Sequence, residues 1–474
     1  MTTTPWLSIL PPLLTIAIAI WSKRIIPSLL VGLLVGGYLL DHRVTGGFET
    51  AVDQIVATLT DKDSLQVLLF LYLFSGLIGV VKKSGGIQAF SALAEKRVKT
   101  QKGVFYLLWA LIPVTFIDCG FRIIGAGSIT RPLAEKKEIP SERLAFMLNN
   151  SASPVVELIP IATTYVGFNL AIIGLGLKSA GVADQTTAYS VWLRAIPLQF
   201  FSIAVIVITF LSMFRASRRG SDPQAASTPH APPAKMHMAM DAMVPVITPR
   251  IVNLIVPMLT VIGLSIFFFW FFGYQRSKDA SLFEAIANTE PNRAMLVALF
   301  VSVFVTVIFY AFQKYGLKAM IPDLISGANE IMPTLVILAL AWPLAAVAQK
   351  LGLNVFIQQL VGSSLPVWSV AVTIFILSAT VTYFIGSGWG AASLIMPFAI
   401  PLAVTVGASV PLCVAAVITG GTFGDVTSPV AGMTNMSSNV AHADHAKYLR
   451  YAAPYNFAAA GVAAMLYLFV GLLT

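Results

Sequence analysis

The chain has 474 residues, of which 57% are hydrophobic and only 11% are charged, and its mean hydropathy is +0.82. A soluble protein of this length needs far more polar surface, so the composition predicts an all-α polytopic membrane protein that contacts the lipid bilayer. The net charge of +9 does not indicate nucleic-acid binding, because the basic residues form short clusters at the ends of apolar runs, as cytoplasmic loops do.

The first half of the chain contains several apolar runs that are typical of membrane helices. The first run lacks a basic segment before it and is followed by Lys23 and Arg24, so we expect a membrane helix with its N-terminus outside rather than a signal peptide. Basic residues within 82–102 and 131–143 predict that these connectors are cytoplasmic. The predicted helices are residues 6–20, 25–40, 65–81, 104–117 and 191–214, the last as one uninterrupted span.

Two segments interrupt these apolar runs. Residues 118–127 carry two charged residues, Asp118 and Arg122, among several glycines, and residues 149–157 combine amides and hydroxyls with Pro154 and Glu157. Irregular backbone at membrane depth is tolerated only where it is buried in protein or lines a wet cavity. Both segments are therefore predicted to be broken or re-entrant and to contribute to a site.

A linker and a second set of apolar runs follow. Residues 215–250 are basic, contain several prolines and have little to bury, which predicts a cytoplasmic linker. Two further breaks are expected, at 386–390 and at 424–438. The second lies within the stretch 420–438, where glycines, hydroxyls, Pro429 and Asp425 follow an apolar run. The predicted helices or half-helices are 251–273, 294–312, 331–347, 367–385, 391–406, 410–420 and 455–473.

The two halves of the sequence repeat each other. Residues 116–122 align with 384–390, and the Ser-Pro-Val segment 153–155 aligns with 428–430. The basic connector of the first copy has a counterpart at 398–410 that carries no Lys or Arg, so the two connectors are expected on opposite faces. This pattern predicts two inverted-topology transmembrane repeats, 1–214 and 251–474, whose broken helices meet near the midplane.

The motifs resemble those of one transporter family. They are Arg131 and Pro132 with residues 141–145, the segments 149–155 and 386–390, residues 423–425, Ser428, Pro429, Thr434, Ser437 and Ser438, and Asp444 and His445 with Pro454 and Tyr455. From about residue 66 onward the chain resembles the NhaC-type sodium/proton antiporters. The resemblance implies an elevator-like secondary active transporter in the cytoplasmic (inner) membrane. Some members of that family are proposed to carry amino acids or carboxylates.

Three positions depart from the pattern of that family. Asn149 and Gly432 stand where the family usually has aspartates, and Arg122 stands where it usually has a neutral polar residue. Two negative charges are therefore replaced and one positive charge is added. An arginine beside the start of a half-helix favours a carboxylate, so we expect a small carboxylate or amino-acid-like solute coupled to Na⁺ or H⁺, with plain sodium/proton exchange as the alternative.

Each candidate residue also has a structural interpretation. Asp118 and Arg122 are spaced to form an ion pair on one helix face. Glu157 is either an interfacial residue or the carrier of a proton or cation. The hydroxyls and amides at the breaks can bind Na⁺ or satisfy backbone groups that Pro154 and Pro429 leave free, and Trp389 can stack on a ligand or simply pack. The predicted substrate-binding residues are Asp118, Arg122, Asn149, Asn150, Ser151, Ser153, Ser387, Trp389, Thr427, Ser428, Thr434 and Asn435.

Ion coupling is assigned to Asp425, Glu157 and Asp118, with Na⁺ near Asp425 as the one metal ion considered. No cofactor beyond the coupling ion is expected, and a homodimer is compatible with the sequence. The chain has only two cysteines, Cys119 and Cys413, so we expect no disulfide framework and no cysteine-based zinc site. Residues 442–445 fit a polar turn better than a metal cluster. An intramembrane hydrolase and a channel remain as the other functional classes.

Overall fold

The computed structural model describes residues 5–43, 45–161, 163–214, 245–276, 289–361 and 366–473. Every regular element in these ranges is a helix. Eight of the described helices are long and apolar enough to cross a membrane, or nine if the bent pair Ala188–Leu198 and Phe200–Ser212 is counted as one span. The prediction of an all-α polytopic membrane protein is confirmed.

The first half of the chain is built from short helices around two long ones. Asp61 begins the longest of them, because its carboxylate accepts a hydrogen bond from the Ser64 amide at 3.0 Å and so caps the helix. The elements are η1 (Pro5–Ile9), α1 (Leu10–Ser22), α2 (Ile25–Leu40), α3 (Gly46–Thr60), α4 (Lys62–Lys82), α5 (Gly86–Arg97), α6 (Gln101–Ala110), α7 (Ile112–Thr115), α8 (Cys119–Lys136), α9 (Ser141–Asn150), α10 (Ser153–Val156), α11 (Thr164–Ser179), α12 (Ala188–Ala195), η2 (Ile196–Leu198) and α13 (Phe200–Ser212).

The second half has longer helices, and one of them forms the centre of the molecule. Every residue from Leu412 to Thr427 on α23 is buried, including several polar ones. The elements are α15 (Val252–Arg276), α17 (Pro291–Phe312), α18 (Leu317–Asn329), α19 (Met332–Lys350), α20 (Leu353–Val361), α21 (Val367–Ile385), α22 (Gly388–Val406), α23 (Val410–Thr427), α24 (Gly432–Val440) and α25 (His445–Leu473). A buried helix that carries several polar residues positions their side chains against several neighbours at once.

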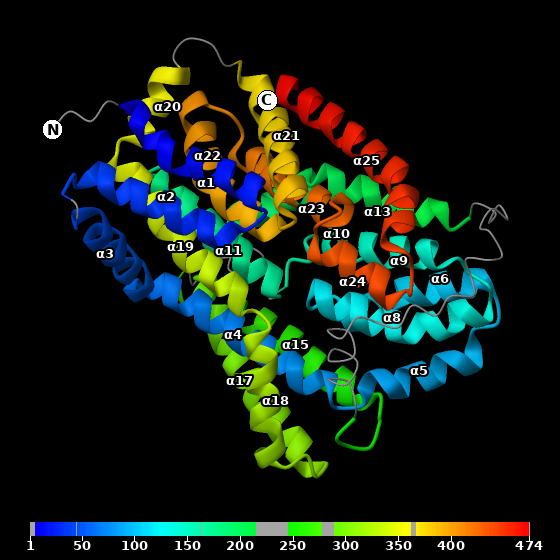
Figure 1. The fold of residues 1–474 in the computed structure, drawn as a ribbon. Coiled ribbons are helices and arrows are strands. Elements are labelled where there is room, and N and C mark those ends of the chain that lie inside the picture. Colours follow the sequence, from blue (N-terminus) through cyan, green and yellow to red (C-terminus); the bar gives the residue numbers. More distant parts are fainter. Residues whose placement is uncertain are drawn as a thin grey trace.

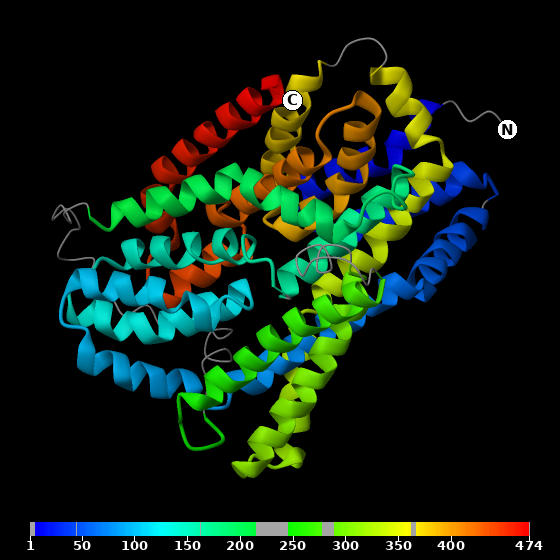
Figure 2. The same ribbon diagram turned by 180° about the vertical axis from the view of Figure 1, so that it is seen from behind.

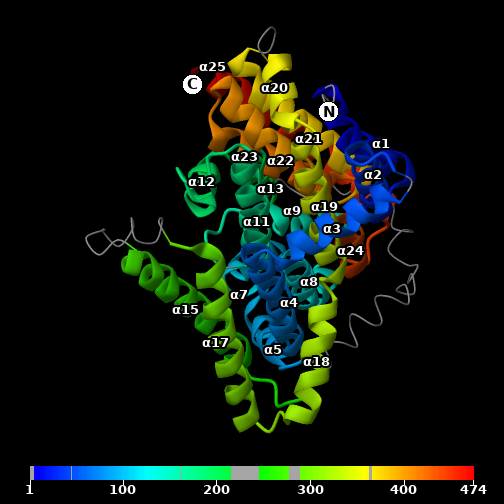
Figure 3. The same ribbon diagram turned by 90° about the vertical axis from the view of Figure 1, so that its left-hand side faces the viewer.

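Helices from the two halves of the chain are interleaved. The short helix α24 packs against α8 and α9 of the first half (Figure 1), and α11 packs against α22 of the second half. On the far side, α25 runs beside α13 (Figure 2). The first-half helix α4 lies between α17 and α18 (Figure 3). The breaks of both halves are thereby brought together around α23.

The structure has breaks at the four predicted places. Residues 116–118 separate α7 from α8, and 151–152 separate α9 from α10. Residues 386–387 separate α21 from α22, and 428–431 separate α23 from α24. Gly386 has a φ of +75°, and a Cβ there would lie 2.7 Å from the Val430 carbonyl oxygen, so this turn requires glycine. Whether the two halves are inverted copies stays a prediction.

Two of the expected breaks are shorter than predicted. The glycine-containing residues 119–127 are helical as part of α8, and residues 421–427 continue α23 instead of ending it at 420. The glycines serve close packing: a Cβ on Gly127 would lie 2.1 Å from Val440 Cγ1, and one on Gly424 would lie 2.1 Å from Thr382 Cγ2. Small residues let membrane helices approach each other closely, so the irregular backbone is confined to the turns.

The prediction of one uninterrupted span over 191–214 is wrong. The chain bends by 43° between η2 and α13, because Pro197 cannot donate a backbone hydrogen bond and its ring prevents a continuous helix. The predicted linker 215–250 falls mostly on residues 215–244, which lie outside the described residues. The division of the chain into repeat, linker and repeat therefore stays a prediction.

Candidate functional site

Asp425 lies on the buried helix α23 and faces the start of α22. Its side chain is 6% exposed, and its Oδ1 accepts a hydrogen bond from the Gly388 amide at 2.9 Å. The amides at a helix N-terminus stabilise a negative charge. A Cβ on Gly388 would lie 2.8 Å from Asp425 Oδ2 and 3.0 Å from the Gly421 carbonyl oxygen. Glycine at this position therefore lets the carboxylate contact the helix start directly.

Glu157 lies directly after α10 and is completely buried. Its Oε2 accepts hydrogen bonds from the Tyr165 hydroxyl at 2.8 Å and from the Thr422 hydroxyl, while Oε1 has no partner among the described residues. Thr422 is three residues before Asp425, so both contacts come from the same face of α23. A carboxylate from the first half and one from the second half thus share one buried region.

Asp118 brings a third acidic group to this region. Asp118 caps α8 by accepting from the Phe121 amide at 2.9 Å, and its second oxygen accepts from the Thr164 hydroxyl at 3.1 Å. Thr164, which donates to Asp118, is adjacent in the chain to Tyr165, which donates to Glu157. The three predicted ion-coupling residues are therefore linked through α11 and α23 near the start of α8.

Arg122 does not pair with Asp118, contrary to the structural interpretation suggested by their spacing. The guanidinium is completely buried and donates to Ser151 O at 2.5 Å and Ser151 Oγ at 2.9 Å. It also donates to Thr115 Oγ1 at 2.8 Å and Leu108 O at 3.2 Å. No carboxylate of the described residues lies within 4.0 Å of it. Its charge is held by neutral oxygens alone.

The asparagines at the first break reach across to the second half. Asn149 donates to the Tyr448 hydroxyl at 2.7 Å and to the Val426 carbonyl at 3.4 Å, and Asn150 donates to Asn456 Oδ1 at 2.8 Å. Asn456 in turn donates to Val426 O at 2.8 Å. These amides satisfy a carbonyl near the end of α23, where Pro429 interrupts the helical hydrogen bonds. The amide oxygens of Asn149 and Asn150 have no partner among the described residues.

Several other predicted residues have local partners. Ser387 caps α22 by accepting from the Gly390 amide at 3.1 Å, and Ser428 donates to Tyr383 O at 2.6 Å. Trp389 packs on the Phe168 ring with centroids 4.5 Å apart. The remaining contacts are Thr434 to Ser428 O at 2.8 Å and Asn435 to Ala431 O at 2.8 Å. Buried Thr427 is different, since its hydroxyl has no partner among the described residues.

Four residues that the sequence analysis did not single out complete the site. Tyr165 and Thr422 bind Glu157, and Tyr448 and Asn456 bind the asparagines of the first break. Thr422 lies within the polar segment 420–438 and Asn456 follows the Pro454 motif, so both had a sequence signal. Tyr165 lies in a segment without any such signal, and only the fold brings it to Glu157.

Residues 442–445 do not converge on one point. His442 contacts Arg131 at 2.8 Å, whereas His445 contacts Ser438 and the Pro429 carbonyl at 3.0 Å each. Asp444 accepts from the Lys447 amide at 2.8 Å at the start of α25. Within the described ranges, no group of three His, Cys, Asp or Glu side chains could hold a metal ion.

Comparisons with known proteins identify the family to which most of the sequence is similar and two solved structures with a similar fold. Residues 155–472 match the sequence profile described as the Na⁺/H⁺ antiporter family. An uncharacterized protein of Haemophilus influenzae (strain ATCC 51907 / DSM 11121 / KW20 / Rd) is 25% identical over 477 aligned residues, which cover 98% of this chain and 90% of that protein.

Two solved structures are similar to the whole molecule. The crystal structure of the Alcanivorax borkumensis YdaH transporter has a TM-score of 0.60 at 17% identity and covers 98% of both chains. The structure of Neisseria gonorrhoeae MtrF has a TM-score of 0.56 at 16% identity and covers 89% of this chain and 84% of MtrF. At these identities the likeness establishes the fold.

Proposed function

The chain belongs to the Na⁺/H⁺ antiporter family, and from this premise we propose that it moves a small carboxylate or amino-acid-like solute, coupled to Na⁺ or H⁺. It is a multi-pass membrane transporter and not an enzyme, because its family and its structural neighbours are transporters or efflux pumps. The resemblance to NhaC-type antiporters noted in the motifs is confirmed by the family match.

The observation that supports an organic solute is the charge of Arg122. A completely buried guanidinium that is held only by neutral oxygens is costly, because burial removes hydration that no counter-ion replaces. A solute carboxylate at the neighbouring break would offset this charge. The three acidic groups at the start of α8 would receive the coupling ion and the ammonium group of an amino acid.

The ion-coupling role is supported by the position of the carboxylates. Glu157 comes from the first half and Asp425 from the second, and Thr422 connects them through α23. A small displacement of one half against the other would alter both carboxylates at once. Ionisable groups inside a membrane protein commonly mark ion pathways. We assign proton transfer to Glu157 and Na⁺ or proton binding to Asp425.

A structural relative offers independent support. The MtrF structure is reported to illuminate a class of antimetabolite efflux pumps, so this fold is linked to cargo other than simple ions in at least one protein. Sodium/proton exchange without an organic solute is the second candidate, and the family description favours it. In either case we place the protein in the inner membrane, with no cofactor beyond the coupling ion. A homodimer and an elevator-like movement belong to the same proposal.

A thermal-shift screen followed by uptake is the direct test. Purified protein is heated with single amino acids and with small mono- and dicarboxylates, with and without NaCl. At a solute concentration of 100 times Kd, binding to the folded state adds about 2.7 kcal/mol of stability, which raises Tm measurably. We expect at least one solute to do so and to enter proteoliposomes when a Na⁺ or pH gradient is imposed. Uptake that is unaffected by both gradients would contradict coupling, and flux that does not saturate would indicate a channel.

A further inference from the structure

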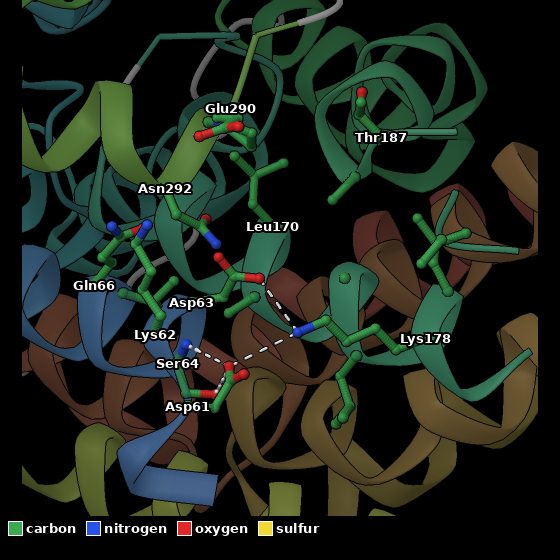
Figure 4. A pocket seen from close by; sticks show the side chains of 18 of the residues that line it. Asp61, Lys62, Asp63, Ser64, Gln66, Leu170, Lys178, Thr187, Glu290 and Asn292 are labelled. Atoms are coloured by element: carbon green, nitrogen blue, oxygen red, sulfur yellow. Dashed lines mark hydrogen bonds and ion pairs between the residues drawn. The ribbon is translucent and has the colours of Figure 1, made fainter. Parts of the chain in front are cut away.

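A cavity of about 380 Å³ lies away from the carboxylates, where α4, α12 and α17 begin and α11 ends (Figure 4). Helix α11 connects the two places, since Thr164 at its start contacts Asp118 and residues 170–178 near its end line the cavity. The lining on α11 begins at Leu170, five residues after Tyr165, which is a rise of roughly 7.5 Å at 1.5 Å per residue. None of Asp118, Glu157 and Asp425 lines the cavity. The cavity is therefore distinct from the candidate site but belongs to the same packed unit.

Charges of both signs line this cavity. Lys178 is held by Asp63 at 3.2 Å and by Asp61 at 3.7 Å, and Asp61 also caps α4. Glu290 and Lys62 line the same cavity and form no ion pair with any described residue. A ligand that enters would thus meet an unpaired carboxylate and an unpaired ammonium group.

Buried polar atoms without partners also line the cavity. Thr289 is completely buried and Trp342 is 3% exposed. The Thr289 hydroxyl, the Trp342 indole N–H and the Asn292 amide oxygen have no hydrogen-bond partner among the described residues. Figure 4 shows Asn292 and Asp63 pointing toward each other. Buried polar groups are normally satisfied, because leaving them unpaired is costly, so these three atoms indicate a polar ligand.

The start of α17 adds donors for a negative group. Glu290 makes no side-chain capping bond to this 22-residue helix, and Pro291 occupies its first turn. The amides of the next residues are among those that a helix leaves without backbone partners, and such amides bind carboxylates well. The fully buried Thr289 hydroxyl lies next to them in the chain. Donors and acceptors are therefore both present around one cavity, with the charged side chains at its solvent-exposed side.

We propose that this cavity is a second binding site for a small zwitterion of the α-amino-acid type. The start of α17, the Trp342 indole and Lys62 supply donors for its carboxylate. Asn292, Asp63 and Glu290 supply acceptors for its ammonium group. This inference rests on the proposed function in one respect, namely that the bound zwitterion is the transported solute on its way to or from the carboxylates.

The test is equilibrium binding and thermal shift of purified protein with each of the twenty standard amino acids, in Asp425→Asn and wild-type backgrounds. Thr289→Val removes one unpartnered polar atom and keeps the side-chain shape, so this variant should fold as well as the wild type. Trp342→Phe removes the indole N–H together with part of the buried ring system, so its Tm is measured beside its binding. We expect each to weaken amino-acid binding roughly 3- to 10-fold, the worth of one neutral hydrogen bond. Thr306→Val is the matched control, since Thr306 on α17 is also buried and unpartnered among the described residues but does not line the cavity.

The outcomes separate this inference from the proposed function. Binding that survives Asp425→Asn and weakens in Thr289→Val, but not in Thr306→Val, supports the cavity site. If Asp425→Asn no longer binds the amino acid and the wild type takes it up under a gradient, the cavity site is overturned and the proposed function stands. If the amino acid binds in the cavity but no gradient drives its uptake, the cavity site stands and the transport proposal is overturned. An amine or an amide that lacks one of the two charges should bind at least tenfold more weakly, and equal binding would overturn the zwitterion.

Discussion

Asp425→Asn is expected to abolish gradient-driven transport while the protein remains folded. The carboxylate accepts from the Gly388 amide, and asparagine can still accept that bond through its amide oxygen but carries no charge for a cation. The attraction between two unit charges about 4 Å apart is worth a few kcal/mol in a partly polar protein environment. Removing the negative charge of Asp425 is therefore expected to lower the affinity for the coupling ion roughly tenfold or more. Uptake by proteoliposomes under an imposed Na⁺ gradient, together with Tm in detergent, measures both effects.

The exposed Asp184 provides the matched control for this variant. Asp184→Asn removes one carboxylate from a surface segment and should leave both uptake and Tm unchanged. Coupled uptake at the wild-type rate in Asp425→Asn would show that the carboxylate does not hold the ion. A Tm of Asp425→Asn that lies far below the wild-type Tm would show that Asp425 stabilises the fold and would assign it a structural role.

Glu157→Gln is expected to remove the pH dependence of transport. Glutamine keeps the size of the side chain and can accept from Tyr165 and Thr422, which now contact Oε2, so the fold should persist. A rate limited by one titrating group changes about tenfold per pH unit on its limiting side. We expect this slope in the wild type and a flat profile in the variant, measured as solute uptake across a series of external pH values.

Tyr165→Phe separates proton transfer from packing at Glu157. It removes one hydrogen bond to the carboxylate and keeps the ring that faces Trp389 with centroids 6.0 Å apart. The pH profile should shift along the pH axis and keep its slope, because the titrating group is still present. If Glu157→Gln retains the wild-type slope, the proton is carried elsewhere and Glu157 is a structural residue.

The positions of the breaks could be predicted from the sequence because their causes are local. Pro429 cannot donate in a helix, and Gly386 adopts a φ of +75° that other residues rarely reach. Glycines such as Gly424 were misread as breaks because their role depends on a distant helix. Only the fold shows that Gly424 contacts Thr382 on α21. Local sequence therefore located each break but overestimated the length of those at 118–127 and 424–438.

The partners within the site could not be predicted in the same way. Thr422 and Glu157 are 265 residues apart in the chain, and Asn150 and Asn456 are 306 apart. Without an assigned topology, nothing in the sequence specifies which polar residues meet. The spacing of Asp118 and Arg122 even indicated an ion pair on one helix. In the structure Asp118 caps α8, so it points to the helix start and away from the next turn.

Proton flux in proteoliposomes distinguishes transport of an organic solute from plain sodium/proton exchange. Wild-type protein is reconstituted with a pH-sensitive dye inside the vesicles, a Na⁺ gradient is imposed, and the internal pH is followed before and after addition of the solute found by thermal shift. If the cargo is a small organic solute, we expect little Na⁺-driven proton movement without it and a clear, saturable stimulation by it, which Asp425→Asn abolishes. Fast Na⁺-driven proton movement with no organic solute present, unchanged when the solute is added, would instead identify a plain sodium/proton antiporter.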